Sequence, residues 1–167
     1  MLNLAKCLAA ALFVLTLGGT FAQGDHRGHS TQDAAFAQRE QEVMSFDLDA
    51  TLHTFEKSGR GGFERVTADD PQDDRNIALV REHLRKEAGR FARGDFSDPA
   101  YLHGEDMAGL STLEEAAAVG RLRVSYADLP DGAELTFAVE DETALAALHA
   151  WFDAQVRDHG EHATESP

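Results

Sequence analysis

Residues 69–110 read DDPQDDRNIALVREHLRKEAGRFARGDFSDPAYLHGEDMAGL, and this stretch decides the fold. It predicts an acidic turn, a helix over 75–93 and then a compact loop. Asp73 or Asp74 can cap the first amides of the helix, where a carboxylate also suits the positive end of the helix dipole. Gly94 supplies the left-handed residue that ends it. The apolar residues recur at the spacing of one buried helical face: Ile77, Val80, Leu84, Ala88 and Phe91.

The loop after this helix predicts one further helical turn. Asp98 can cap it, Pro99 fits its first position, and Gly104 can end it. Two more carboxylates, Glu105 and Asp106, follow directly. The loop therefore brings many polar groups close to the end of the helix.

Strand patterns lie on both sides of this segment. From Met44 onward, apolar and polar residues alternate with a period of two, which indicates a half-buried strand with Leu52 on its covered face and His53 on the opposite face. The glycine-rich residues 59–62 predict a hairpin turn. The remaining elements are expected at 63–68 (strand), 110–119 (helix), 121–126 (strand), 130–132 (turn), 134–139 (strand) and 143–158 (helix).

The two halves therefore share one order of strand, turn, strand, acidic cap and amphipathic helix. This order predicts an α+β fold in which two ββα units form a four-stranded, mainly antiparallel sheet with the helices packed on one face. We expect a single domain over 44–160, a C-terminal tail over 161–167, and a flexible N-terminal lead-in over 23–43 in which 34–43 favour a weak helix.

The N-terminus has the pattern of an export signal. Residues 1–22 hold one charge, Lys6, and a short apolar core, and they end in Thr20-Phe21-Ala22, an acceptable cleavage site. Cys7, the single cysteine, lies inside this segment. The sequence therefore predicts a periplasmic or secreted protein without disulfides, and with no stable membrane insertion after signal cleavage.

The composition is acidic, with 30 Asp and Glu against 15 Lys and Arg and a formal net charge of −15. Nucleic acids and anionic lipids are bound largely through basic residues, so the balance disfavours both as partners. It is compatible with cationic ligands, including metal ions, and it also serves solubility.

Five short motifs within 44–160 stand out as a pattern: Thr51-Leu52-His53-Thr54-Phe55, Asp70-Pro71-Gln72-Asp73, Arg81-Glu82-His83-Leu84, Gly94-Asp95-Phe96 with Pro99 and His103-Gly104, and His149-Ala150-Trp151-Phe152 with Asp158-His159. In these motifs the chain resembles a group of small exported bacterial proteins, some of which carry an aspartate carbamoyltransferase label. The resemblance carries over no functional residue. The label does not fit, because the chain is far too short and lacks that enzyme's Ser-Thr-Arg-Thr phosphate-binding stretch.

Histidines carry the metal-binding hypothesis. Imidazole is the commonest protein metal ligand, and a cysteine-free domain would combine it with carboxylates or methionine. The candidate ligands are His83 on the central helix and His103, Glu105 and Asp106 on the loop, with a divalent transition metal such as copper or zinc as the ion. Against this, each histidine could equally be a core-edge residue with a hydrogen-bond partner, which is how we interpret His149 and His159.

The alternative is an interaction module without a metal. Phe96, Tyr101 and Trp151 could form a helix–loop surface for a protein or a small ligand. No nucleophile motif, phosphate-binding glycine loop or dinucleotide fingerprint is present in the sequence. We therefore expect a domain without catalytic activity of its own.

Overall fold

The computed structural model describes residues 26–166, so the predicted signal peptide lies outside the described residues. The helices are α1 (His26–Val43), α2 (Asp74–Phe91), α3 (Ser97–His103), α4 (Leu110–Ala118) and α5 (Glu142–His159). The strands are β1 (Thr51–Ser58), β2 (Gly61–Ala68), β3 (Leu122–Leu129), β4 (Gly132–Val139) and β5 (Ala163–Ser166). Two 3-10 turns complete the chain, η1 (Leu48–Ala50) and η2 (Gly160–His162).

The strands form one five-stranded mixed sheet with the order β3-β4-β2-β1-β5. The pairs among β1 to β4 are antiparallel, whereas β5 runs parallel to β1, with His53 opposite Ala163. The α+β class is confirmed, but the prediction of four strands was wrong. Residues 163–166, predicted as part of a tail, add the fifth strand because the chain turns back at η2 after α5.

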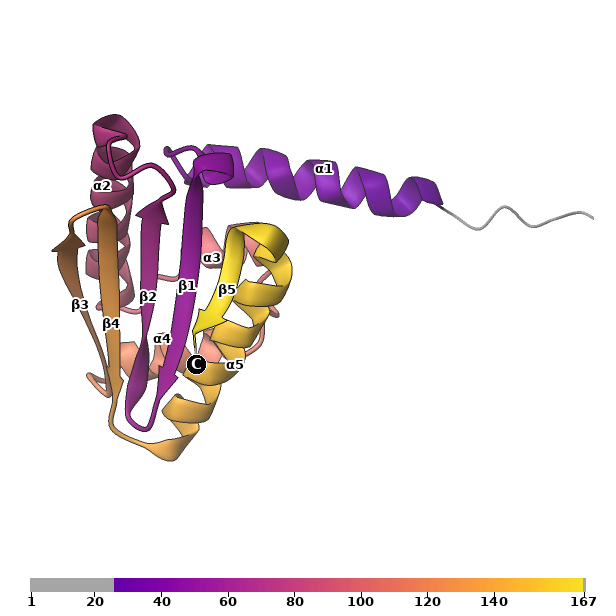
Figure 1. Cartoon of the computed structure of the whole chain (residues 1–167). Helices are drawn as coiled ribbons and strands as arrows, with labels where there is room; N and C mark the ends of the chain where they lie inside the picture. The colour runs from indigo at the N-terminus through magenta and orange to yellow at the C-terminus, as the bar shows by residue number, and fades with distance from the viewer. Residues whose placement is uncertain (1–25, 167) are drawn as a thin grey trace, which may run out of the picture.

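The helices α2, α4 and α5 lie behind the sheet in Figure 1, and its other face is open. Burial alternates along β1 accordingly: His53 and Phe55 are buried, whereas Leu52 and Thr54 are only partly so. This is the reverse of the face predicted from the sequence. The alternating residues 46–50 are not strand, because Asp47 accepts a hydrogen bond from the Asp49 amide at 3.1 Å and caps η1.

Helix α2 forms as its sequence predicts. Asp73 caps it by accepting a hydrogen bond from the Asn76 amide at 3.0 Å. Gly94 has a φ of 78° and ends the segment in the left-handed region that glycine favours. The predicted stripe is buried against the sheet, together with Asn76 and Glu87. The chain then enters α3, where Gly104 is the C-cap and Phe96, not Asp98, is the N-cap.

Trp151 of α5 is the centre of the core. It is fully buried, and its ring centroid lies 5.9 Å from Phe91, 5.9 Å from Phe96 and 5.7 Å from Phe137. The buried face of α5 is broad. Its buried members are Ala144, Ala147, Leu148, Trp151, Phe152, Ala154, Gln155 and His159.

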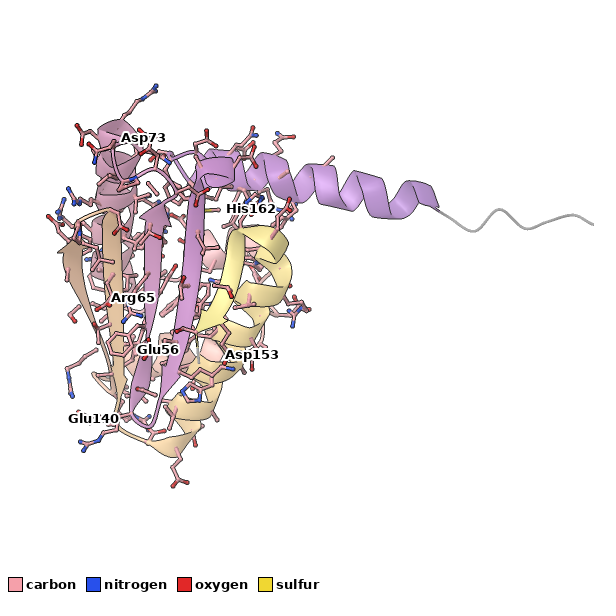
Figure 2. The ribbon with its side chains drawn as sticks, viewed as in Figure 1. Glu56, Arg65, Asp73, Glu140, Asp153 and His162 are labelled. Atoms are coloured by element: carbon pink, nitrogen blue, oxygen red, sulfur yellow. The ribbon has the colours of Figure 1, made fainter. Side chains whose placement is uncertain are left out.

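The open face of the sheet is polar. Arg65 lies between Glu56 and Glu134 on neighbouring strands, donating to a Glu56 oxygen at 2.8 Å and a Glu134 oxygen at 2.6 Å (Figure 2). Lys57 at the end of β1 pairs with Asp153 of α5. A polar open face opposite a buried face is expected of an antiparallel sheet with one solvated side.

None of the helices described here is long and apolar enough to cross a membrane.

Leu148 gives a test of the α5 packing. Because Leu148 is fully buried, Leu148→Ala should lower the free energy of unfolding by about 2–5 kcal/mol. Leu145→Ala is the matched control: it lies one turn earlier, is only partly buried and should cost less. Urea denaturation of both variants gives the comparison, and equal losses would contradict this packing.

Candidate ligand cavity

A small polar cavity lies between the sheet, α2, α3 and α5. Its volume is about 40 Å³. That space admits an ion with a water molecule or two, whereas sites for organic ligands are usually about 300 Å³ or larger. Its lining residues are Val43, Met44, His53, Glu64, His83, Leu84, Glu87, Phe91, Asp98, Pro99, Leu102, His103, Leu135, Trp151, Gln155 and His159.

Four of these lining residues are histidines from four different elements. His53 comes from β1, His83 from α2, His103 is the last residue of α3, and His159 is the last residue of α5. The ring centroid of His159 lies 5.2 Å from that of His53 and 5.1 Å from that of His103. His83 lies further round the wall, where its ring packs against Phe46 at 5.4 Å. Residues distant in the sequence thus meet at one point.

Two of the imidazoles have an outer nitrogen with a defined partner. His103 Nδ1 donates to Asp158 Oδ2 at 3.1 Å, and His159 Nδ1 donates to Glu40 Oε1 at 2.9 Å. Because a carboxylate oxygen only accepts, a neutral imidazole that donates from Nδ1 keeps a lone pair on Nε2. These outer partners therefore leave the inner nitrogens of His103 and His159 as acceptors.

Four buried side-chain atoms of the cavity lining have no hydrogen-bond partner. They are His53 Nδ1, His103 Nε2, Trp151 Nε1 and Gln155 Oε1. Leaving a buried polar atom unpaired costs about 1–3 kcal/mol. Four such atoms around one cavity therefore favour a polar occupant.

Burial also keeps the imidazoles neutral. It lowers the pKa of His53 well below its usual value, with the nearby His159 and His83 acting in the same direction. Burial lowers the pKa of His83 to about 4, and it lowers that of His103 to about 4 against the opposing pull of Asp158. At neutral pH these rings carry no proton on the free nitrogen, as metal binding requires.

Three carboxyl groups complete the wall, those of Glu64, Glu87 and Asp98. Burial raises the pKa of Glu64 to about 8, and the nearby Glu87 adds to the shift. Burial raises the pKa of Glu87 to about 7, and the charge of Asp98 acts in the same direction. Arg90 limits the latter effect, since it bonds Glu87 at 3.3 Å and also pairs with Asp98. The negative charge of the wall thus lies mainly on Asp98, which is paired with Arg90.

The structure brings only part of the predicted site together. His83 and His103 both line the cavity, whereas Glu105 and Asp106 are exposed and lie outside it. The metal hypothesis must therefore do without these two carboxylates. Their place in the loop follows Gly104, which turns the chain away from the cavity after α3.

The predicted aromatic surface does not form as a unit. Phe96 and Trp151 are core residues with 1% and 0% exposure, so they offer nothing to a partner at the surface. Tyr101 alone is accessible, at 52% exposure, and its hydroxyl donates to Glu42 of α1 at 2.6 Å.

The cavity residues on β1, on β2 and at the end of α5 were not predicted from the sequence. His53 was assigned to the wrong face, His159 was interpreted as a core-edge residue, and Glu64 was not singled out. One pattern pointed to Glu64: it shares the period-two face of β2 with Gly62 and Val66, both buried. No local pattern indicated that His159 meets Glu40, because the two are 119 positions apart.

The donor atoms are not yet arranged around an ion. Across 26–166 no three His, Cys, Asp or Glu side chains form a ready metal-binding group. The rings of His53 and His159 are parallel to within 4°, whereas the ring of His103 is inclined at 79° to that of His159. Binding a shared ion would need rotation of one ring within the cavity.

Comparison of the chain with protein-family models, with curated proteins and with solved structures found no match.

Glu64 gives a test of the buried charge. Its pKa is raised from 4.5 to about 8 in the folded protein, so the folded state holds more protons within this window and stability falls as pH rises through it. One pKa unit is worth about 1.4 kcal/mol, so the free energy of unfolding should fall by several kcal/mol as the pH rises to 8.

Glu64→Gln should therefore raise the melting temperature most at pH 8 and little at pH 5. Thermal unfolding with a chelator present gives the measurement. Glu56→Gln, on the open face of β1, is the control. A gain that is the same at both pH values would contradict a protonated Glu64.

Proposed function

We propose that this protein is a non-catalytic domain that binds one transition metal ion in the buried cavity, with His53, His103 and His159 as ligands. The observation that carries the proposal is the set of outer hydrogen bonds. Metal-binding histidines almost always donate the second ring N–H to a carboxylate or a backbone carbonyl, which fixes the tautomer and the ring orientation. His103 and His159 have carboxylate partners of this kind, and His53 adds a buried Nδ1 without a partner.

The ring separations support a shared ion. Two imidazoles on one tetrahedral ion, each with a metal–nitrogen bond of about 2 Å, place their ring centroids about 5 Å apart. The observed separations from His159 are 5.2 Å and 5.1 Å. Rotation of the His53 ring, whose Nδ1 has no partner to lose, would turn its lone pair toward the others.

The donor set favours copper, with zinc as the second choice. Nitrogen ligands bind Cu(II) more tightly than Zn(II), and the thioether of Met44 in the same wall would suit Cu(I). The raised pKa of Glu64, about 8, keeps it largely protonated near neutral pH, whereas Glu87, with a pKa of about 7, is only partly ionised, so oxygen is the less available donor. His83 is the nearest candidate for a fourth ligand, and water is the other.

The volume of the cavity argues against catalysis. About 40 Å³ holds the ion and little else, so an organic substrate has no room beside it. The acidic surface suits a protein that meets cations outside the cell. Export itself is proposed only from the sequence of residues 1–22.

Metal titration tests the proposal. The full chain carrying His26→Ala and His29→Ala, which remove two further histidines, should bind one Cu(II) and, more weakly, one Zn(II) in calorimetry. His53→Gln, His103→Gln and His159→Gln should each abolish stoichiometric binding. Asp158→Asn should weaken it about 10–100-fold, the usual effect of losing an outer partner.

The matched control is His149→Gln. His149 is on the same helix as His159, but its Nε2 bonds the Gly61 carbonyl at 3.0 Å outside the cavity. Its loss should leave metal affinity unchanged, and nitrogen hyperfine coupling in the Cu(II) electron paramagnetic resonance spectrum should persist. Failure to bind either ion, or binding that survives all three cavity substitutions, would overturn the proposal and favour a cavity filled with water.

A further inference from the structure

A wide groove runs along the outside of the histidine cluster. Its volume is about 890 Å³, and it lies between α1, α3 and the turn after α5. Its lining residues are Ala35, Phe36, Ala37, Arg39, Glu40, Leu102, His103, Asp158, His159, Gly160, Glu161 and His162. Leu102, His103 and His159 line both this groove and the buried cavity, so these three residues form the partition between them.

One aromatic ring of α1 covers this partition. The centroid of Phe36 lies 5.3 Å from that of His103 and 6.0 Å from that of His159. One turn further along the same helix, Glu40 holds the outer nitrogen of His159. Helix α1 therefore supplies both the cover of the two rings and the outer partner of one of them.

The attachment of α1 to the domain is confined to its C-terminal half. Arg39 donates to the Leu102 carbonyl at 3.2 Å and 3.1 Å, and Glu42 accepts the Tyr101 hydroxyl at 2.6 Å. The rest of α1 runs away from the domain in Figure 1. Among the described residues, side-chain hydrogen bonds join α1 to the rest of the domain at three sites: the partly or fully exposed contacts of Arg39 and Glu42, and the buried bond between Glu40 and His159.

The charge of the groove suits a cation. Glu40, Asp158 and Glu161 contribute carboxylates to its lining, against the single guanidinium of Arg39. At the rim of the groove, His162 Nε2 lies 3.7 Å from Asp49 Oδ1. A negative groove raises the local concentration of cations and speeds their arrival. The opposite walls of the cavity are packed core, with Leu84, Leu135 and Trp151 buried to 2% exposure or less.

We infer that α1 is a gate: movement of its C-terminal half withdraws Phe36 from His103 and His159, and the ion passes between the acidic groove and the buried histidines. This inference rests on the proposed metal site, because it assigns the route by which that site is filled and emptied. It assigns no ligand role to α1 itself. Arg39 holds the gate closed, since its two bonds to the Leu102 carbonyl join α1 to α3. Arg39 itself does not line the cavity.

Exchange kinetics test the gate. In Arg39→Gln the transfer of bound Zn(II) to an excess of a chromophoric chelator should be about tenfold faster, since losing two hydrogen bonds of ordinary strength shifts a closed–open equilibrium by roughly that factor. Phe36→Ala should act in the same direction. The dissociation constant should change much less than the rate, because opening speeds both binding and release. Gln38→Ala, an exposed neighbour on the same helix, is the control.

A second measurement does not depend on the metal. Diethylpyrocarbonate modifies unprotonated imidazoles that solvent reaches, and mass spectrometry locates the products. In the metal-free protein, Arg39→Gln should speed modification of His103 and His159 while leaving that of His149 unchanged. Circular dichroism checks that each variant is folded.

The outcomes separate the two proposals. Faster modification in a protein that binds no Zn(II) would retain the gate and overturn the metal site. Stoichiometric Zn(II) binding with unchanged exchange and modification rates in both Arg39→Gln and Phe36→Ala would retain the metal site and overturn the gate.

Discussion

Coverage of the sheet on one side only is the constraint on which the rest of this structure depends. Along the central strands β1, β2 and β4, most residues that face the helices are buried, whatever their chemistry. Phe55, Val66 and Leu135 fit this requirement at no cost, and with Trp151 they form the core. His53 and Glu64 lie on the same face and are buried at 4% and 9% exposure. A polar cavity therefore exists because polar residues occupy positions that the sheet requires to be buried.

The segment around Arg90 links this constraint to the loop. Arg90 near the end of α2 bonds Asp95 at 3.0 Å and pairs with Asp98, the second residue of α3. These bonds fix where α3 begins, and α3 then carries His103 to the cavity at its last residue. The acidic loop residues Asp95 and Asp98 thus orient the helix that bears His103. The charged groups of this loop therefore position α3, and the nitrogen donor His103 lies at the far end of that helix.

The sequence was informative wherever the pattern is local. The Asp73 cap, the stripe of α2 and the end at Gly94 follow from neighbouring residues, and all three were predicted correctly. The covered face of β1 was not, because alternation tells which residues share a face and not which face the helices choose. The fifth strand depends on the pairing of Ala163 with His53, which is a contact between the two ends of the domain. His83 and His103 could be proposed from sequence, whereas His159 required knowledge of where α5 ends relative to α1.

The proposed metal site rests on the unpaired atoms of the cavity and on the outer hydrogen bonds of its histidines. A water-filled cavity would satisfy some of the four unpaired atoms. The bonds to Asp158 and Glu40 pair buried polar groups, and they also orient the rings of His103 and His159 and raise their basicity, as the partners of metal-binding histidines do. These bonds fix one tautomer at each ring, with the lone pair on the other nitrogen. That tautomer is the one that the proposed metal site requires.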